Sequence, residues 1–149
     1  YLKESPNAKL IIAGADDGMQ NELEIKINNL NITNAVFLIG MVNKQQKIEL
    51  LSSSSVFALA SAFESFGIVV AEALACGLPV VVSNKTPWKD IEVNNCGILA
   101  ENQKDDFCRA LKQLKSMRFS KDSCRKYINS HYDWNVIIRH FRHHFLTKK

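Results

Sequence analysis

Short apolar runs alternate with longer amphipathic segments along the whole chain. The runs are rich in valine, isoleucine and leucine, which is typical of strands buried on both faces of a sheet. The longer segments repeat apolar residues every three or four positions, which is typical of helices that cover a sheet. We predict strands at residues 8–14, 35–40, 56–61, 79–84 and 97–100, and helices at residues 16–31, 43–54, 66–77, 104–116, 121–131 and 134–146.

Residue types at the ends of the predicted helices support these boundaries. Asn43 and Asp133 stand where two helices begin, and their side-chain oxygens suit the free N–H groups of a first turn. Gly77 closes another helix, with Pro79 just beyond it. Because strands alternate with helices, we expect an α/β fold with a Rossmann-like, doubly wound parallel sheet.

Ligands of doubly wound folds bind at the carboxyl ends of the parallel strands. The loops that follow Gly14, Gly40, Ser61 and Ser83 occupy those ends in the predicted order of elements. We therefore expect these four loops to form the rim of a binding site.

Composition agrees with a globular protein and excludes several other classes. The 149 residues are 46% hydrophobic and 23% charged, which predicts one domain with an ordinary core. The longest apolar run is interrupted by Glu72, Gly77 and Pro79, so it does not predict a membrane span. Nothing at the start resembles an export signal, and we expect a cytoplasmic protein.

The four cysteines form no metal-binding or disulfide pattern. They are 20, 12 and 16 residues apart, with no CxxC pair and no histidine at ligand spacing. We predict free thiols at Cys76, Cys96, Cys108 and Cys124.

The net charge of +4 is concentrated in the closing segment RHFRHHFLTKK. Without interleaved stacking aromatics or a groove-binding motif, it indicates a solvated helix face and no nucleic-acid partner. Peripheral contact with an anionic membrane surface stays open. His140 and His144 are four residues apart but have no third ligand, so no metal site is predicted.

Two acids interrupt the most apolar part of the chain. Glu64 falls in the loop before the predicted helix at 66–77, and Glu72 falls inside that helix. A buried carboxylate is costly without hydrogen-bond partners. The amides of Phe66, Gly67 and Ile68 are free donors at the expected helix start, a place that suits a phosphate.

Two interpretations of Glu72 are equally supported by the residues alone. Its carboxylate can accept two ribose hydroxyls, as the acid of dinucleotide-binding folds does. It can equally form a structural ion pair or cap a neighbouring loop.

The segment FESFGIVVAEALACGLPVVVSN, residues 63–84, resembles the E-x7-E region of family 4, or group 1, glycosyltransferases. The usual pattern there reads roughly E-x-F-G-[LI]-x-x-x-E-A-[ML]-A-x-G-x-P-V-V. Twelve positions match: Glu64, Phe66, Gly67, Ile68, Glu72, Ala73, Leu74, Ala75, Gly77, Pro79, Val80 and Val81. The segments AKLIIAG, VFLIGMVNKQQKIELLSSSSVFALAS and NNCGILAENQKDDFCRALKQL also fall in family positions, so the resemblance covers nearly the whole chain.

The resemblance implies the C-terminal, donor-binding half of a GT-B enzyme, in which two Rossmann-like domains face a cleft. The chain opens on YLKESPNAKLIIAG without a methionine, so we expect residues 1–149 to be this domain truncated at its N-terminal edge. The acceptor-binding domain and the family's diphosphate-binding Arg and Lys would then be absent. Such a piece would bind the donor without transferring sugar.

The resemblance also implies roles for individual residues. Glu64 would contact the transferred sugar as the catalytic-site acid, and Glu72 would bind the ribose. The loop residues Ser65, Phe66, Gly67 and Ile68 would hold the diphosphate and sugar. Gly14 would let the chain pass close to the nucleotide, and Gly40, Met41 and Val42 would meet the base.

By resemblance, the reaction retains anomeric configuration and needs no metal or other cofactor. The donor would be a UDP- or GDP-linked sugar, and the acceptor a glycan or a lipid-linked glycan in polysaccharide biosynthesis. A peripheral position at the inner membrane face would suit such an acceptor. A non-catalytic nucleotide-binding or regulatory module on the same fold is the alternative, because a fold alone does not set function.

The loop after the fourth predicted strand departs from the family. It reads NKTPWKDIEVNN, with Trp88 in the turn and Asp90 where the family has Glu. Trp88 either shapes a sugar or acceptor subsite or covers the sheet edge. Lys85 and Lys89 are expected to be solvated, with the diphosphate as the alternative partner.

Overall fold

The computed structural model describes the backbone of residues 1–146 and the side chains of residues 1–143. The predictions for the His144, Lys148 and Lys149 side chains lie outside that part. The chain divides into two compact units, Tyr1–Lys47 and Ile48–Lys149, which are described separately.

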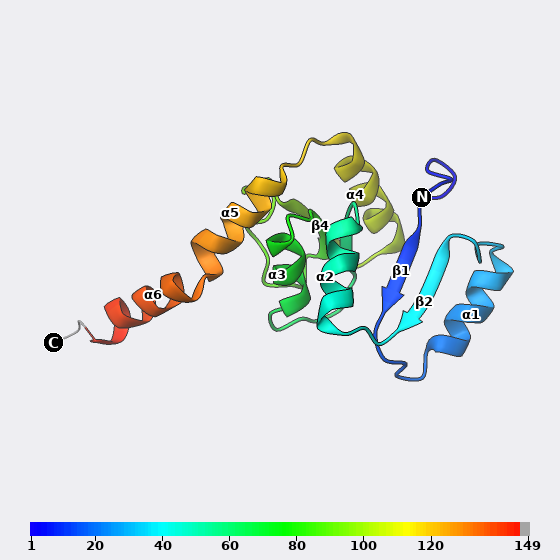
Figure 1. The fold of residues 1–149 in the computed structure, drawn as a ribbon. Helices are drawn as coiled ribbons and strands as arrows, with labels where there is room; N and C mark the ends of the chain where they lie inside the picture. The colour runs from blue at the N-terminus through cyan, green and yellow to red at the C-terminus, as the bar shows by residue number, and fades with distance from the viewer. Residues whose placement is uncertain (147–149) are drawn as a thin grey trace. The chain divides into compact units, whose positions relative to one another are not determined.

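The first unit contains two parallel strands and the helix between them (Figure 1). Strand β1 (Leu10–Ala13) pairs with β2 (Val36–Gly40), and α1 (Gln20–Asn29) connects them. The loop before α1 is held by Asp16, whose carboxylate accepts the N–H groups of Gln20 and Gly18 at 3.0 and 2.8 Å. These two hydrogen bonds hold the pKa of Asp16 below its usual value.

The prediction that residues 8–14 form a buried strand is half wrong. The strand exists, but all four of its residues are exposed. Burial on both faces requires neighbours and covering helices, whereas within this unit β1 has one paired strand and α1 buries no residue fully.

Helix α2 (Lys44–Ser53) begins in the first unit and ends in the second. The predicted N-cap at Asn43 is confirmed: its Oδ1 accepts the N–H of Gln46, and the Gln46 side chain accepts the N–H of Asn43, both at 2.9 Å. This reciprocal pair is a capping box. Of the two apolar residues that the helical period would turn inward, Leu51 is buried, whereas Ile48 is exposed.

The second unit is built on a parallel sheet in the order β3–β4–β5. Its strands are β3 (Phe57–Leu59), β4 (Val80–Ser83) and β5 (Gly97–Ala100), and its helices after α2 are α3 (Ile68–Ala75), α4 (Lys104–Ser116), α5 (Lys121–Tyr132) and α6 (Trp134–Leu146). The described strands thus pair as two sheets, one in each unit.

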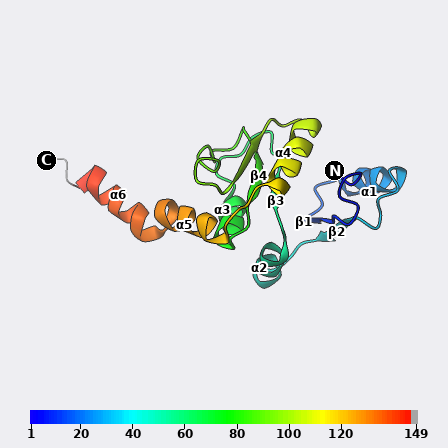
Figure 2. The same ribbon diagram turned by 90° about the horizontal axis from the view of Figure 1, so that it is seen from above.

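Alternate residues of β4 face two different cores. Val80 and Val82 pack with Leu74 of α3, whereas Val81 packs with Ala110 of α4. Figure 2 shows α3 and α4 on opposite sides of β4. The sheet of this unit is therefore covered on both faces, and the predicted parallel α/β fold is confirmed.

Both ends of α3 are defined by glycines. At the C-terminal end, Gly77 has φ 80° and its N–H donates to the Leu74 carbonyl, while the N–H of Leu78 donates to Ala73, both at 2.9 Å. This is a Schellman arrangement, and it confirms the prediction that Gly77 closes the helix.

The last helix, α6, continues beyond α5 and away from the sheet (Figure 1). It begins as predicted at Asp133, whose carboxylate accepts the N–H of Asn135 at 2.8 Å. Its aromatic residues Trp134 and Phe141 are exposed. Within the described chain, no helix has the length and apolar character needed to cross a membrane.

All four cysteines are free, as predicted. Cys96 and Cys124 are buried, whereas Cys76 and Cys108 are half-buried. The neighbouring Cys124 and burial raise the pKa of the Cys96 thiol, so this thiol stays protonated at neutral pH.

Candidate functional site

The loop between β3 and α3 brings Glu64 against the backbone of Gly67. Gly67 is buried and left-handed, with φ 72° and ψ 63°. A Cβ on Gly67 would lie 3.0 Å from Cγ of Glu64 and 3.3 Å from Cγ2 of Val70. The stem of Glu64 therefore rests on the surface that Gly67 leaves open, which fixes where its carboxylate can lie.

We expect Gly67→Ala to destabilise the chain by about 1–2 kcal/mol, because the left-handed backbone strains any side chain, with the Glu64 contact adding to the loss. Urea unfolding measures the effect. Gly18→Ala is the control, because Gly18 also has a positive φ (96°) but has open space where a Cβ would be. Equal losses in the two variants would contradict a role for the Glu64 contact.

The start of α3 lies two residues later than predicted. The helix begins at Ile68, and Gly67 is its N-cap, while Ser65 and Phe66 belong to the preceding loop. The left-handed backbone of Gly67 ends the loop and excludes Phe66 from the first turn. The N–H of Val70 donates to the Gly67 carbonyl at 2.8 Å. Ile68 and Val69 thus supply the first amides of the helix, which have no acceptor within it.

Glu72 lies one helical turn after Ile68, about 6 Å along the axis. It is half-buried, and its Oε2 atom is below the surface. Its neighbours Val70, Ala73 and Leu74 are fully buried. Glu64 and Glu72 therefore come from the two ends of one short segment that starts at the carboxyl end of β3. This is the segment after Ser61, whose loop the sequence predicts to form part of the rim of a binding site.

Trp88 is a core residue. Its side chain is 1% exposed, and its indole Nε1 donates to the backbone oxygen of Phe66 at 2.5 Å. Of the two predicted roles, a sugar or acceptor subsite on its ring face is wrong, because the ring is enclosed. Lys85 and Lys89 are both exposed, and Lys89 donates to the backbone oxygen of Asn84.

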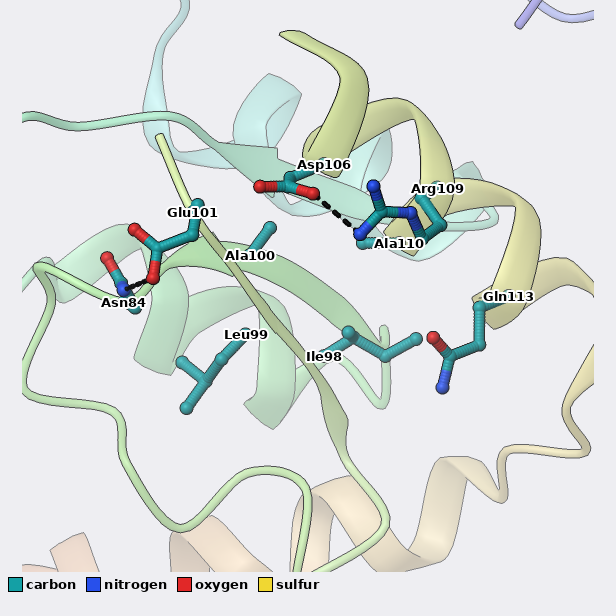
Figure 3. A pocket seen from close by; sticks show the side chains of 9 residues that line it. All are labelled: Asn84, Ile98, Leu99, Ala100, Glu101, Asp106, Arg109, Ala110 and Gln113. Carbon is teal, nitrogen blue, oxygen red and sulfur yellow. Dashed lines mark hydrogen bonds and ion pairs between the residues drawn. The ribbon is translucent and has the colours of Figure 1, made fainter. Parts of the chain in front are cut away.

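A pocket of about 380 Å³ lies where β4 and β5 end beside α4 (Figure 3). Nδ2 of Asn84 donates to Glu101 at 2.5 Å, and Arg109 pairs with Asp106 at 2.7 Å. None of the predicted site residues lines this pocket. The sequence pointed to this pocket through one residue, Asn84, which begins the rim loop expected after Ser83.

The remaining predicted site residues lie in the first unit. The structure brings Gly14 and Gly40 together: the N–H of Gly14 donates to the Gly40 carbonyl at 2.9 Å. Gly40 is left-handed, with φ 66°. Met41 is 76% exposed and Val42 is half-buried. These residues and those around α3 belong to different compact units.

The chain matches the family "Glycosyl transferases group 1" over residues 1–134. It belongs to this family. The family match confirms the resemblance stated from the E-x7-E segment.

Two curated relatives illustrate the similarity. The uncharacterized glycosyltransferase MJ1607 of Methanocaldococcus jannaschii is 32% identical over 93% of this chain and 37% of its own length. The UDP-Gal:alpha-D-GlcNAc-diphosphoundecaprenol alpha-1,3-galactosyltransferase of Escherichia coli is 32% identical over 90% of this chain and 35% of its own length. The chain thus spans little more than a third of these relatives.

Solved glycosyltransferase structures share the fold. The lipopolysaccharide outer core galactosyltransferase WaaB superposes with a TM-score of 0.81 at 22% identity, over 95% of this chain and 41% of WaaB. HepE of Anabaena in complex with UDP superposes with a TM-score of 0.72 at 23% identity, over 93% of this chain and 41% of HepE. The predicted Rossmann-like half of a GT-B fold is confirmed.

Proposed function

We propose that this chain is the nucleotide-sugar donor-binding domain of a retaining, metal-independent glycosyltransferase. The observation that carries the proposal is the arrangement of Glu64 on Gly67 at the start of α3, with Glu72 one turn further along. A carboxylate at each end of a stretch of free amides matches an elongated ligand with a sugar, a diphosphate and a ribose.

Each part of the proposed site has a distinct task. The amides of Gly67 and Ile68 donate to the diphosphate, where the positive end of the helix dipole favours an anion. Glu72 accepts hydrogen bonds from the ribose hydroxyls, and Glu64 contacts the transferred sugar. Phe66 is proposed to hold the diphosphate and sugar through its backbone. Ser65, which is exposed in the loop, is proposed to hold the same two groups.

The proposed donor is a UDP- or GDP-linked sugar. HepE was solved with UDP, and a Mycobacterium tuberculosis relative is named a GDP-mannose-dependent mannosyltransferase. The base is proposed to meet Gly40, Met41 and Val42, with Gly14 close to the nucleotide. These four positions rest on the family resemblance.

The proposed acceptor is a lipid-linked or free glycan in cytoplasmic polysaccharide biosynthesis at the inner membrane face. The names of two relatives include a phosphatidylinositol dimannoside and a diphosphoundecaprenol-linked sugar, which supports a lipid-linked acceptor. An acceptor domain in a longer protein would supply this part of the site.

Titration of the 149-residue chain with UDP, GDP and ADP in the presence of EDTA tests the proposal. We expect UDP or GDP to raise the melting temperature and to release or absorb heat in calorimetry, because both the amides and Glu72 have a ligand group to bind. We also expect the chain to release no sugar from UDP- or GDP-hexose. The site would be weakened if diphosphate-binding residues precede residue 1, so the control is the same titration of a longer protein that includes a segment before residue 1. If neither protein responds to any nucleotide, the donor-binding role is wrong.

A further inference from the structure

Trp88 joins two loops that are far apart in the chain. It follows β4, yet its buried indole donates to the carbonyl of Phe66, 22 residues earlier, at 2.5 Å. Its ring also contacts the ring of Phe66, with centroids 5.1 Å apart and an interplanar angle of 45°. Trp88 therefore holds the segment that leads into α3 through both a hydrogen bond and a ring contact.

The hydrogen bond from Trp88 sets the direction of a neighbouring amide. The described chain contains no cis peptide bond, so the carbonyl of Phe66 and the N–H of Gly67 point in opposite directions within one planar unit. With that carbonyl held by the indole N–H, the N–H of Gly67 points away from the indole. The next peptide unit is held in the same manner, since the Gly67 carbonyl accepts the N–H of Val70 at 2.8 Å.

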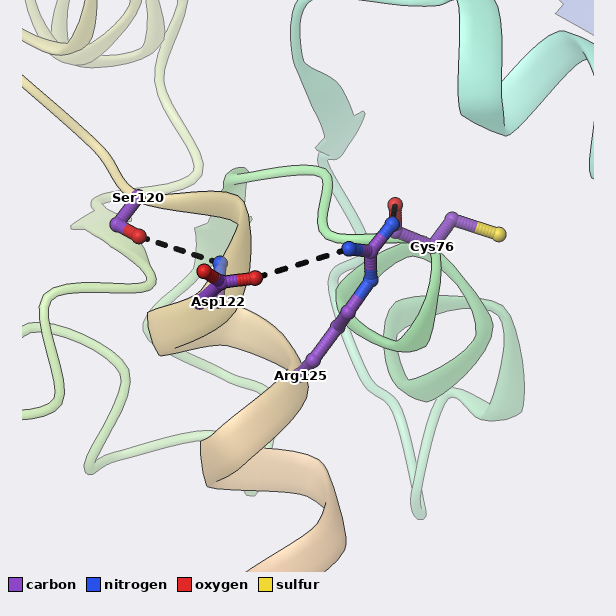
Figure 4. Close-up of polar contacts among 4 residues, drawn as sticks. All are labelled: Cys76, Ser120, Asp122 and Arg125. Atoms are coloured by element: carbon purple, nitrogen blue, oxygen red, sulfur yellow. Dashed lines mark hydrogen bonds and ion pairs between the residues drawn. The ribbon is translucent and has the colours of Figure 1, made fainter.

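The support behind Trp88 is itself anchored to α3 through α5. Tyr132, at the end of α5, lies with its ring centroid 5.0 Å from Trp88 and 5.6 Å from Phe66. In the first half of α5, Arg125 donates to the Cys76 carbonyl at 3.3 Å and lies 3.8 Å from Asp122 (Figure 4). Phe66 and Tyr132 thus lie against the indole, and α5, which carries Tyr132, is tied to the C-terminal end of α3 by Arg125.

We propose that Trp88 is a positioning residue of the donor site. It does not touch the donor; it holds the Phe66–Gly67 peptide so that the N–H of Gly67 is aimed at the diphosphate before the ligand arrives. This inference rests on the proposed donor-binding function. A Trp that only fills the core would contribute to stability but would not affect this amide.

The test replaces Trp88 with 3-benzothienylalanine, which keeps the ring shape and exchanges the indole N–H for sulfur. In the 149-residue chain we expect the affinity for UDP or GDP to fall about five- to tenfold, the effect of one lost ordering hydrogen bond. In ¹⁵N-labelled protein, the amide resonances of Gly67 and Ile68 should shift, whereas those of α4 should not. Ile91→Val is the control: it trims the same core cluster and leaves the hydrogen bond from Trp88 to Phe66 in place, so it should lower stability and keep the affinity.

Each outcome of this test has a separate meaning. Weaker nucleotide binding together with shifted Gly67 and Ile68 resonances supports the positioning role. If the wild-type chain binds nucleotide and the benzothienyl variant binds it equally well, the positioning role is wrong and the proposed function stands. If the wild-type chain binds no nucleotide in either length of protein, the proposed function fails, and the donor role of Trp88 with it.

Discussion

Glu72→Ala is expected to weaken nucleotide binding about 10- to 100-fold. The proposed role gives the carboxylate two hydrogen bonds to ribose hydroxyls, and hydrogen bonds to a charged group contribute about 1.5–3 kcal/mol each. Because Glu72 is half-buried, water compensates part of that loss, so we expect less than the full sum. Isothermal titration calorimetry with UDP and GDP measures the change.

The same experiment with 2′,3′-dideoxynucleotides isolates the contact. Wild type should bind the dideoxynucleotide as weakly as Glu72→Ala binds the ribonucleotide, and the variant should lose nothing further. Such non-additivity is the signature of two groups in direct contact. Glu22→Ala, at an exposed position in the first turn of α1, is the control for loss of one negative charge. A Glu72→Ala chain with wild-type affinity would remove Glu72 from the site.

The apolar pattern predicts the elements of this chain well, because each element has a local cause. Gly77 ends α3 through a left-handed residue, and Asn43 begins α2 through a capping box. Such causes depend on a few residues that are close together in the sequence, so they can be predicted from it. The family was also predictable, because the E-x7-E segment concentrates twelve matched positions in one stretch.

Burial was less predictable, because it depends on which strands become neighbours. The runs at β1 and β4 look alike in sequence, yet β4 has a partner on each side and is buried throughout. Among the described strands, β1 pairs only with β2, and it is exposed. An apolar run predicts that a strand can be buried. Whether it is buried depends on the number of strands that pair with it.

The site loop shows the same limit at single residues. Helical periodicity continues smoothly through Phe66 and Gly67, so the pattern placed both in the helix, whereas the left-handed φ of Gly67 ends the loop there. The role of Trp88 was equally hidden, since its partner is a backbone oxygen 22 residues away and carries no sequence signal. Backbone direction and long-range hydrogen bonds are therefore what the structure adds to the site.

The first turn of α3 is ordered before any ligand binds. Gly67, the stem of Glu64 and the buried indole of Trp88 all act on the two peptide units on either side of Gly67. All three are in position without a bound ligand. Donors fixed before binding lose less conformational freedom when the ligand arrives. In the proposed metal-independent reaction, such prearranged amides would stabilise the leaving diphosphate.

Glu64→Gln is expected to slow sugar transfer by about 100- to 1000-fold, the usual cost of removing one group that stabilises developing charge. The measurement uses a longer protein that carries the proposed acceptor domain and compares kcat with the dissociation constant for the nucleotide alone. Because Glu64 is proposed to meet the sugar and not the nucleotide, kcat should fall while nucleotide affinity stays within about twofold. The amide keeps the stem that rests on Gly67, so the loop should keep its shape.

Glu49→Gln on α2 is the control, because it neutralises an exposed acid that has no part in the proposed site. Its kcat should match that of the wild-type protein. A fall in nucleotide affinity with Glu64→Gln would instead place the carboxylate at the nucleotide end of the ligand. Transfer at the wild-type rate would show that Glu64 serves only to pack against Gly67 and has no catalytic-site role.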